Sequence, residues 1–138
     1  MKVLVDTNVL LDVWLQREPF WQSSARVIEL VEKRKISGTL SPTSITTLHY
    51  LARRGVGEAK VRKLLKVLLQ LFEIAVLKKE NFANALESKL KDFEDAVLES
   101  IAQSDGLDFI VSRNVKDFRR SAVKVVDPAE FLQIIEAS

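Results

Sequence analysis

Three separate stretches of the chain carry oxygen-bearing side chains that suit a hard divalent cation. Asp6 directly follows a short valine-rich run at residues 2–5, and Asn114 follows an apolar run at residues 109–112. Asp92 and Asp95 are three residues apart, so they share one face if the segment is helical. Oxygen ligands are those that Mg²⁺ and Mn²⁺ prefer, and clustered carboxylates need a cation to relieve their repulsion. The pattern therefore predicts a divalent metal site.

The same acids also have purely structural interpretations. Asp6 is suited to cap a following helix, because an aspartate accepts hydrogen bonds from the free N–H groups of the first turn. Asp92 and Asp95 suit the start of a helix, where the helix dipole stabilises negative charge. The spacing alone leaves both interpretations open.

The composition narrows the chemistry that such a site could perform. The 138 residues include no cysteine and one histidine, His49, which excludes disulfides, thiolate zinc sites, iron–sulfur clusters and sites built on two histidines. We expect His49 to be a surface or packing residue. No apolar run suits a membrane span or a signal peptide, so we expect one cytoplasmic domain over residues 1–138 without a membrane partner.

Charge is distributed unevenly along the chain, although the net charge is only +2. Residues 50–70 carry six basic side chains against Glu58 alone, and residues 92–105 carry five acidic side chains and no basic one. This combination suits phosphate binding beside a metal. Two solvated helix faces would explain the same runs. The candidates for contact with an RNA backbone are Arg53, Arg54, Lys60, Arg62 and Lys63.

The elements that must position these residues alternate between strands and helices. Strands are predicted at residues 2–5, 39–41, 73–77, 109–112 and 124–126. Helices are predicted at residues 9–15, 22–35, 42–54, 59–71, 80–90, 93–103 and 128–136, with Gly55 and Gly57 ending the third and Asp127 capping the last. This order predicts an α/β fold with a mainly parallel sheet and helices on both faces. Ligands bind beyond the carboxyl ends of such strands, where Asp6 and Asn114 stand.

Four motifs resemble those of the PIN domain family. Residues 6–12, DTNVLLD, resemble the opening motif of that family, and residues 92–96, DFEDA, match its later acidic motif. Residues 112–118, SRNVKDF, resemble its strand-exit motif, and residues 127–132, DPAEFL, resemble its closing strand-to-helix step. The resemblance covers essentially the whole chain, with the motifs in the family's order.

The resemblance implies a three-layer α/β/α PIN-like fold with about five strands, a Mg²⁺ or Mn²⁺ cofactor and endonucleolytic cleavage of RNA. It makes Asp6 the first metal-binding acid and Asp95 the later one. Asn114 takes the place often held by a fourth acid, and Asn8 resembles an Asn that steadies the site by hydrogen bonding. Many small stand-alone members are VapC-type toxins of type II toxin–antitoxin pairs, which implies a small antitoxin protein as a partner.

One position departs from the family pattern. A Glu is usual early in the helix after the second strand, and Thr47 stands there, where its hydroxyl cannot supply the missing charge. We expect Asp92 and Asp117 to add carboxylates to the site in its place. The alternative is a weak or inactive PIN-like domain that binds RNA or a partner protein. An aspartyl phosphatase ranks lower. Such enzymes carry a D-x-D motif after the first strand, and here Asn8 stands in place of the second Asp.

The segment at residues 59–71 carries more apolar side chains than one buried helix stripe requires. They are Val61, Leu64, Leu65, Val67, Leu68, Leu69 and Leu71. Extra apolar surface often marks an interface, so we expect a homodimer.

Overall fold

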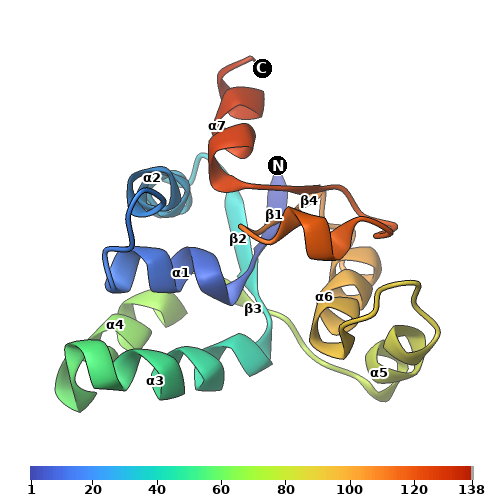
Figure 1. Cartoon of the computed structure of the whole chain (residues 1–138), viewed down its shortest axis with the longest axis horizontal. Helices are drawn as coiled ribbons and strands as arrows, with labels where there is room; N and C mark the ends of the chain where they lie inside the picture. The colour runs from blue at the N-terminus through green and yellow to red at the C-terminus, as the bar shows by residue number, and fades with distance from the viewer. Residues whose placement is uncertain (138) are drawn as a thin grey trace.

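A five-stranded sheet with the order β3-β2-β1-β4-β5 forms the centre of the computed structural model, which describes residues 1–137 (Figure 1). The strands are β1 (Lys2–Val5), β2 (Ser37–Leu40), β3 (Glu73–Ile74), β4 (Phe109–Val111) and β5 (Val125–Val126). Each neighbouring pair in this sheet is parallel. The prediction of an α/β fold with about five parallel strands is confirmed.

The central strand β1 is buried on both faces. Val3 and Val5 pack into one apolar cluster, and Leu4 between them packs into another. Successive side chains of a strand point to opposite faces, so a strand covered on both sides is apolar at every position. The run Val3-Leu4-Val5 therefore fits the middle of the sheet.

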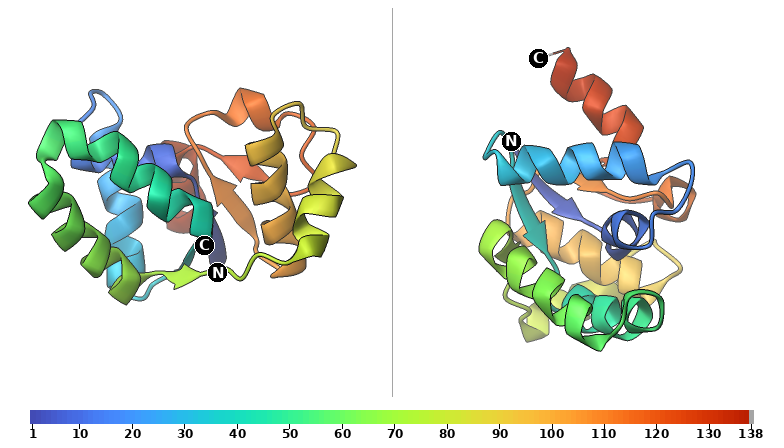
Figure 2. Two further views of the ribbon diagram at one scale, coloured as in Figure 1. Left: turned by 90° about the horizontal axis from the view of Figure 1, so that it is seen from below. Right: turned by 90° about the vertical axis from the view of Figure 1, so that its left-hand side faces the viewer.

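Helices cover both faces of the sheet, as the predicted three-layer arrangement requires (Figures 1 and 2). The cluster that contains Val3 and Val5 also includes side chains of α1 (Thr7–Trp14), α2 (Trp21–Glu32), α3 (Pro42–Val56), α4 (Glu58–Leu71) and α7 (Pro128–Glu136). The cluster that contains Leu4 includes side chains of α5 (Lys79–Leu86), α6 (Phe93–Ser104) and the 3₁₀ helix η1 (Val115–Phe118). No helix within residues 1–137 is both long and apolar enough to cross a bilayer.

The third helix ends later than the sequence predicts. α3 continues through Gly55 to Val56, and Gly57 alone ends it, with a φ of 89° that favours glycine. A Cβ at Gly55 would lie 2.6 Å from Cδ2 of Leu15, so this glycine allows close packing and does not stop the helix. The fifth helix ends at Leu86, before the predicted residue 90.

Candidate metal centre

The carboxyl ends of β1 and β4 meet where the strand order changes direction. From β1 the chain adds β2 and then β3 on one side, and β4 and β5 lie on the other. Such a switch point leaves a crevice at the carboxyl edge of a parallel sheet. Asp6 follows β1 there, and its backbone N–H donates to the carbonyl oxygen of Val111 at 3.0 Å. Ser112 follows β4 at the same edge, so the two strand exits are held together.

Asp6 is buried and its carboxylate is held at both oxygens. Oδ1 accepts a hydrogen bond from the N–H of Thr7 at 2.7 Å, and Oδ2 accepts one from Oγ of Ser112 at 2.7 Å. Burial raises the pKa of Asp6, and the hydrogen bonds from Ser112 and Thr7 only partly oppose that effect. Repulsion from Asp92 raises the pKa further. A carboxylate in this setting gains from a nearby cation.

Asn8 ties the exits of β1 and β4 together. Its Nδ2 donates to Oγ of Ser112 at 3.3 Å and to Oδ2 of Asp6 at 3.5 Å. Its Oδ1 accepts a hydrogen bond from the backbone N–H of Arg113 at 3.2 Å. These contacts are of the kind expected for the supporting role predicted from the sequence.

A second group of acids lies at the start of α6, across the crevice from β1. Asp92 is the N-cap, and its Oδ1 accepts a hydrogen bond from the N–H of Asp95 at 3.0 Å. The half-buried carboxyl of Asp95 has a pKa raised to about 7, first by burial and then by repulsion from Asp92, Asp6, Asp117 and Glu94 in decreasing order. Acids at the exit of β1, at the start of α6 and in η1 therefore act on one carboxyl.

Glu94 belongs to this group, although the sequence did not single it out. Partial burial of its carboxylate raises its pKa, and repulsion from Asp6 and Asp92 adds to the effect. Its position inside the DFED motif, between two predicted site acids, was the signal available in the sequence. Ser112, the direct partner of Asp6, also escaped prediction, although it begins the strand-exit motif.

The donor set fits a hard divalent cation. The acids that interact are Asp6, Asp92, Glu94, Asp95 and Asp117, so every candidate ligand is a carboxylate oxygen. Over residues 1–137 no three acids or histidines already converge as a metal cage. Mg²⁺ does not require such a cage, because it commonly takes one or two carboxylates and keeps several waters and substrate phosphates. Asp6 and Asp95 can fill that role, and the surplus negative charge around them would favour the ion.

The remaining predicted site residues lie at the same edge of the sheet. Asn114 is exposed at the start of η1, and its N–H donates to Oγ of Ser112 at 3.1 Å. Asp117 is exposed within η1. Thr47 is half-buried on α3, one turn after Ser44, whose Oγ accepts a hydrogen bond from the hydroxyl of Thr7 at 3.0 Å. The start of α3 therefore packs against the start of α1.

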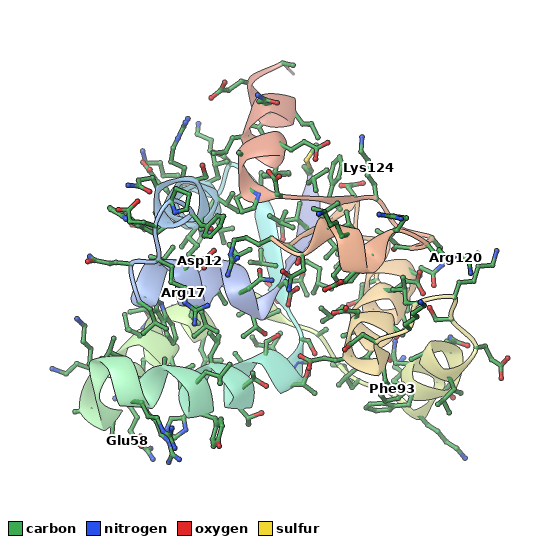
Figure 3. The ribbon with its side chains drawn as sticks, viewed as in Figure 1. Asp12, Arg17, Glu58, Phe93, Arg120 and Lys124 are labelled. Carbon is green, nitrogen blue, oxygen red and sulfur yellow. The ribbon has the colours of Figure 1, made fainter. Side chains whose placement is uncertain are left out.

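The predicted RNA-binding residues lie at the far end of α3 and on α4, away from the acids. α3 leaves the carboxyl edge of the sheet and reaches Arg53 and Arg54 only in its last turn (Figure 1). At about 1.5 Å per residue, they lie on the order of 14 Å along the axis from Ser44. Beyond the turn, Glu58, which is labelled in Figure 3, begins α4. Its carboxylate accepts hydrogen bonds from Nε2 of His49 at 2.7 Å and Nε of Arg62 at 2.8 Å. The structure does not bring this basic stretch to the acids.

Known proteins resemble this chain in sequence and in fold. A model of the PIN domain matches residues 2–116. Ribonuclease VapC1 of Aquifex aeolicus (strain VF5) is 27% identical over 137 residues, which are 96% of this chain and 94% of that protein. A chain in the structure of VapBC2 from Rickettsia felis, bound to a DNA fragment from their promoter, has a TM-score of 0.72 and 17% identity over 92% of this chain and 98% of its own. A chain of a toxin-antitoxin complex from Klebsiella pneumoniae has a TM-score of 0.68 and 23% identity over 91% of this chain and 97% of its own.

Proposed function

The chain belongs to the PIN domain family, and from that membership and the acid site we propose that it is an endoribonuclease that depends on Mg²⁺ or Mn²⁺. The observation that carries the proposal is the pair Asp6 and Asp95, brought together at the switch point of the sheet with raised pKa values. The relative named Ribonuclease VapC1 supports RNA as the substrate.

In the proposed mechanism, Asp6 and Asp95 would hold the ion directly or through water. A bound Mg²⁺ or Mn²⁺ would polarise the scissile phosphate, orient an attacking water and stabilise the developing charge. Ser112 and the N–H of Thr7 donate hydrogen bonds to the carboxylate of Asp6, so the protein itself fixes the orientation of this group. Asp92 caps α6 at the N–H of Asp95 and adds negative charge beside it.

The toxin of a type II toxin–antitoxin pair is the biological role that we propose. Structural neighbours with 13–23% identity come from VapBC and other toxin–antitoxin complexes, which supports a small antitoxin protein as a partner. A small upstream reading frame for a DNA-binding antitoxin would support this role. The absence of such a reading frame would favour a solitary nuclease. Both the toxin and the solitary nuclease are compatible with the proposed location in the cytoplasm.

A weak or inactive domain that binds RNA without cutting it remains the second candidate. The observation in its favour is Thr47, which provides no carboxylate on the α3 side of the crevice. The two candidates differ in whether bound RNA is cleaved when a divalent cation is added.

The test measures RNA cleavage and thermal stability with the same protein preparation. We expect cleavage of single-stranded RNA in millimolar Mn²⁺, its loss in excess EDTA and its return when Mn²⁺ is restored. Because the ion relieves carboxylate repulsion, Mn²⁺ at ~100 times its dissociation constant should stabilise the fold by about 2.7 kcal/mol. RNA that is bound but uncleaved at every metal concentration would favour the second candidate. A melting temperature that is the same in EDTA and Mn²⁺ would reject the metal site.

A further inference from the structure

A groove of about 710 Å³ opens between the loop that joins α5 to α6 and the segment around η1. Five basic residues line it, and they come from two stretches of the chain: Lys89 and Lys91 from the loop, and Lys116, Arg119 and Arg120 from η1 and the residues after it. In Figure 3, Arg120, which follows η1, lies at the outer edge of the molecule on the side that carries the loop between α5 and α6. Folding therefore builds a basic surface that neither stretch forms alone.

The charges of this groove are available to a ligand. None of the five basic side chains has an ion-pair partner within 4.0 Å anywhere in residues 1–137. All five are exposed. By contrast, Arg62 on α4 is already paired with Glu58. Like charges that face one space from two sides create a positive potential that attracts a polyanion.

The groove also leads to the acid site. Its lining includes Asp92 and Asp117, which are two of the four acids that act on Asp95. A chain of phosphates lying in the groove would have its neighbouring phosphate beside the carboxylates, where an ion could bridge the two. An anion with a single charge would not need both the basic groove and the acid site.

We propose that the sugar–phosphate backbone of RNA binds in this groove, through the basic residues at 89, 91, 116, 119 and 120, on its way to the acid site. The inference rests on the proposed ribonuclease function and specifies how the substrate reaches it. It replaces α3 and α4 as the main RNA-binding surface. Contacts to phosphate carry no sequence information, so the groove would position RNA without selecting a cleavage sequence.

The test measures binding of a labelled single-stranded RNA in EDTA, which prevents metal-dependent cleavage, over a range of salt concentrations. Two variants remove charge from opposite walls: Lys116→Gln with Arg120→Gln, and Lys89→Gln with Lys91→Gln. Each lost phosphate contact should reduce the slope of log K against log salt by about 0.7, so each double variant should lose ~1.4. Affinity at low salt should fall with it.

The matched control is Arg34→Gln with Lys35→Gln, which removes the same charge beside Met1 and Lys2 at the amino end of the sheet. We expect its slope and affinity to equal those of the parent. A third variant, Arg53→Gln with Arg54→Gln, tests the basic stretch that the sequence favoured. If the slope of log K against log salt falls only in this third variant, or falls equally in the control, the proposal that RNA binds in the groove is wrong.

Failure of the groove and failure of the nuclease give different results. If the parent cleaves RNA in Mn²⁺ but both groove variants bind RNA like the control, the groove inference is wrong and the nuclease stands. If the groove variants lose slope but the parent never cleaves, the groove stands and the proposed activity is wrong. Unchanged RNA binding with lost binding of a poly-glutamate peptide would reassign the groove to an acidic protein and overturn the proposal.

Discussion

The two carboxylate oxygens of Asp6 have different partners, which lets one residue hold a helix and face a site. Oδ1 caps α1 through the N–H of Thr7, whereas Oδ2 contacts Ser112 at the exit of β4. Asp92 combines similar roles, because it caps α6 and also acts on Asp95. The structural and chemical interpretations of these acids are therefore compatible.

At the residue scale, we predict that Asp6→Asn and Asp95→Asn each abolish RNA cleavage and leave the fold intact. Each change keeps the shape of the side chain and removes one ligand charge. The loss should exceed the ~10–100-fold that removing a hydrogen-bond partner of a metal ligand costs. Cleavage rates and circular dichroism spectra provide the measurement. Asp105→Asn, at the opposite end of α6, is the control for the loss of one charge. Full activity in Asp95→Asn would show that the site is misplaced.

We also predict that the metal-free protein loses stability as the pH rises towards neutrality. The pKa of Asp95 is about 7 in the folded protein against an ordinary value of 3.8, so between these values the native state holds a proton that the unfolded chain has lost. Stability therefore falls through this window, and the loss is complete above it. The raised pKa of Asp6 acts in the same direction.

The measurement is thermal melting in EDTA between about pH 5 and about pH 8. Asp95→Asn should flatten the curve, because its amide does not titrate, whereas Asp105→Asn should keep the slope of the parent. Saturating Mn²⁺ should stabilise the protein most at the upper end of the range, since a cation prefers ionised carboxylates. A melting temperature that rises with pH in EDTA would contradict the prediction.

A further prediction concerns whether Asp92 compensates for Thr47. Asn caps a helix about as well as Asp, so Asp92→Asn keeps the hydrogen bond to the N–H of Asp95 and removes only the charge. If that charge supports the ion, Mn²⁺ affinity and cleavage should fall together by ~10–100-fold. Titration of cleavage against Mn²⁺ for the parent and the variant decides the question. Overlapping curves would leave Asp92 as a cap alone.

At the scale of elements, a buried ion pair joins α1 to the exit of β4. Asp12 on α1 is fully buried, and its Oδ2 accepts a hydrogen bond from Nε of Arg113 at 2.5 Å. Its Oδ1 lies 4.0 Å from Nη1 of Arg17, and Asp12 and Arg17 are both labelled in Figure 3. The guanidinium of Arg113 also lies over the ring of Phe20, 4.3 Å from its centroid. The pair fixes the strand exit that carries Ser112, so it positions the partner of Asp6.

We predict that Arg113→Gln destabilises the fold by about 3–5 kcal/mol, because it removes the hydrogen-bonded partner of a buried charge. It leaves Asp12 only the more distant guanidinium of Arg17, 4.0 Å from Oδ1. Arg26→Gln breaks the exposed pair with Glu136 and should cost no more than ~1 kcal/mol. Urea unfolding of both variants provides the comparison. Asp12→Asn combined with Arg113→Gln should recover part of the loss. Equal, small effects of the two single changes would show that solvent reaches Asp12 when its partner is removed.

The helices could be predicted from the sequence more reliably than the lengths of the strands. The seven predicted helices are all present within residues 1–137, because their apolar periodicity and caps are local properties. β3 is two residues long where five were predicted, since a strand's length depends on the neighbour it pairs with, and β3 pairs with β2 only at Thr39 and Leu40. Strand extent at a sheet edge is a tertiary property.

The candidate site divides in the same way. Asp6 and Asp95 could be predicted, because the switch-point rule and the acidic motifs both point to them. The groove between Lys89 and Arg120 could not be predicted, since its two walls lie far apart in the chain. Each wall also has fewer basic residues than the stretch on α3 and α4. In the folded protein, the basic residues of α3 and α4 lie away from the acids, whereas the basic residues that line the groove lie beside Asp92 and Asp117.

At the scale of the whole molecule, exposed apolar side chains occur in two regions. One lies on α3 and α4, and the other comprises Val76, Phe82, Leu86 and Phe93. Of the apolar residues noted on α4, Val61 and Leu68 are buried, so they belong to the core. Val67 and Leu69 remain 49% and 56% exposed. Tyr50 and Leu51 on the neighbouring α3 are 59% and 46% exposed. Exposed apolar side chains that gather on adjacent helices are typical of an interface.

We predict that this surface joins two copies of the chain in a homodimer. Leu69→Glu should produce monomers, because it would place an unpaired carboxylate in a contact from which water is excluded. Leu86→Glu is the matched control, since Leu86 is 72% exposed at the end of α5 on the other side of the sheet. Light scattering at micromolar concentration should give twice the chain mass for the parent and the control, and the chain mass for Leu69→Glu. A parent that scatters as a monomer would reject the dimer, and the apolar residues of α3 and α4 would then be free to contact an antitoxin.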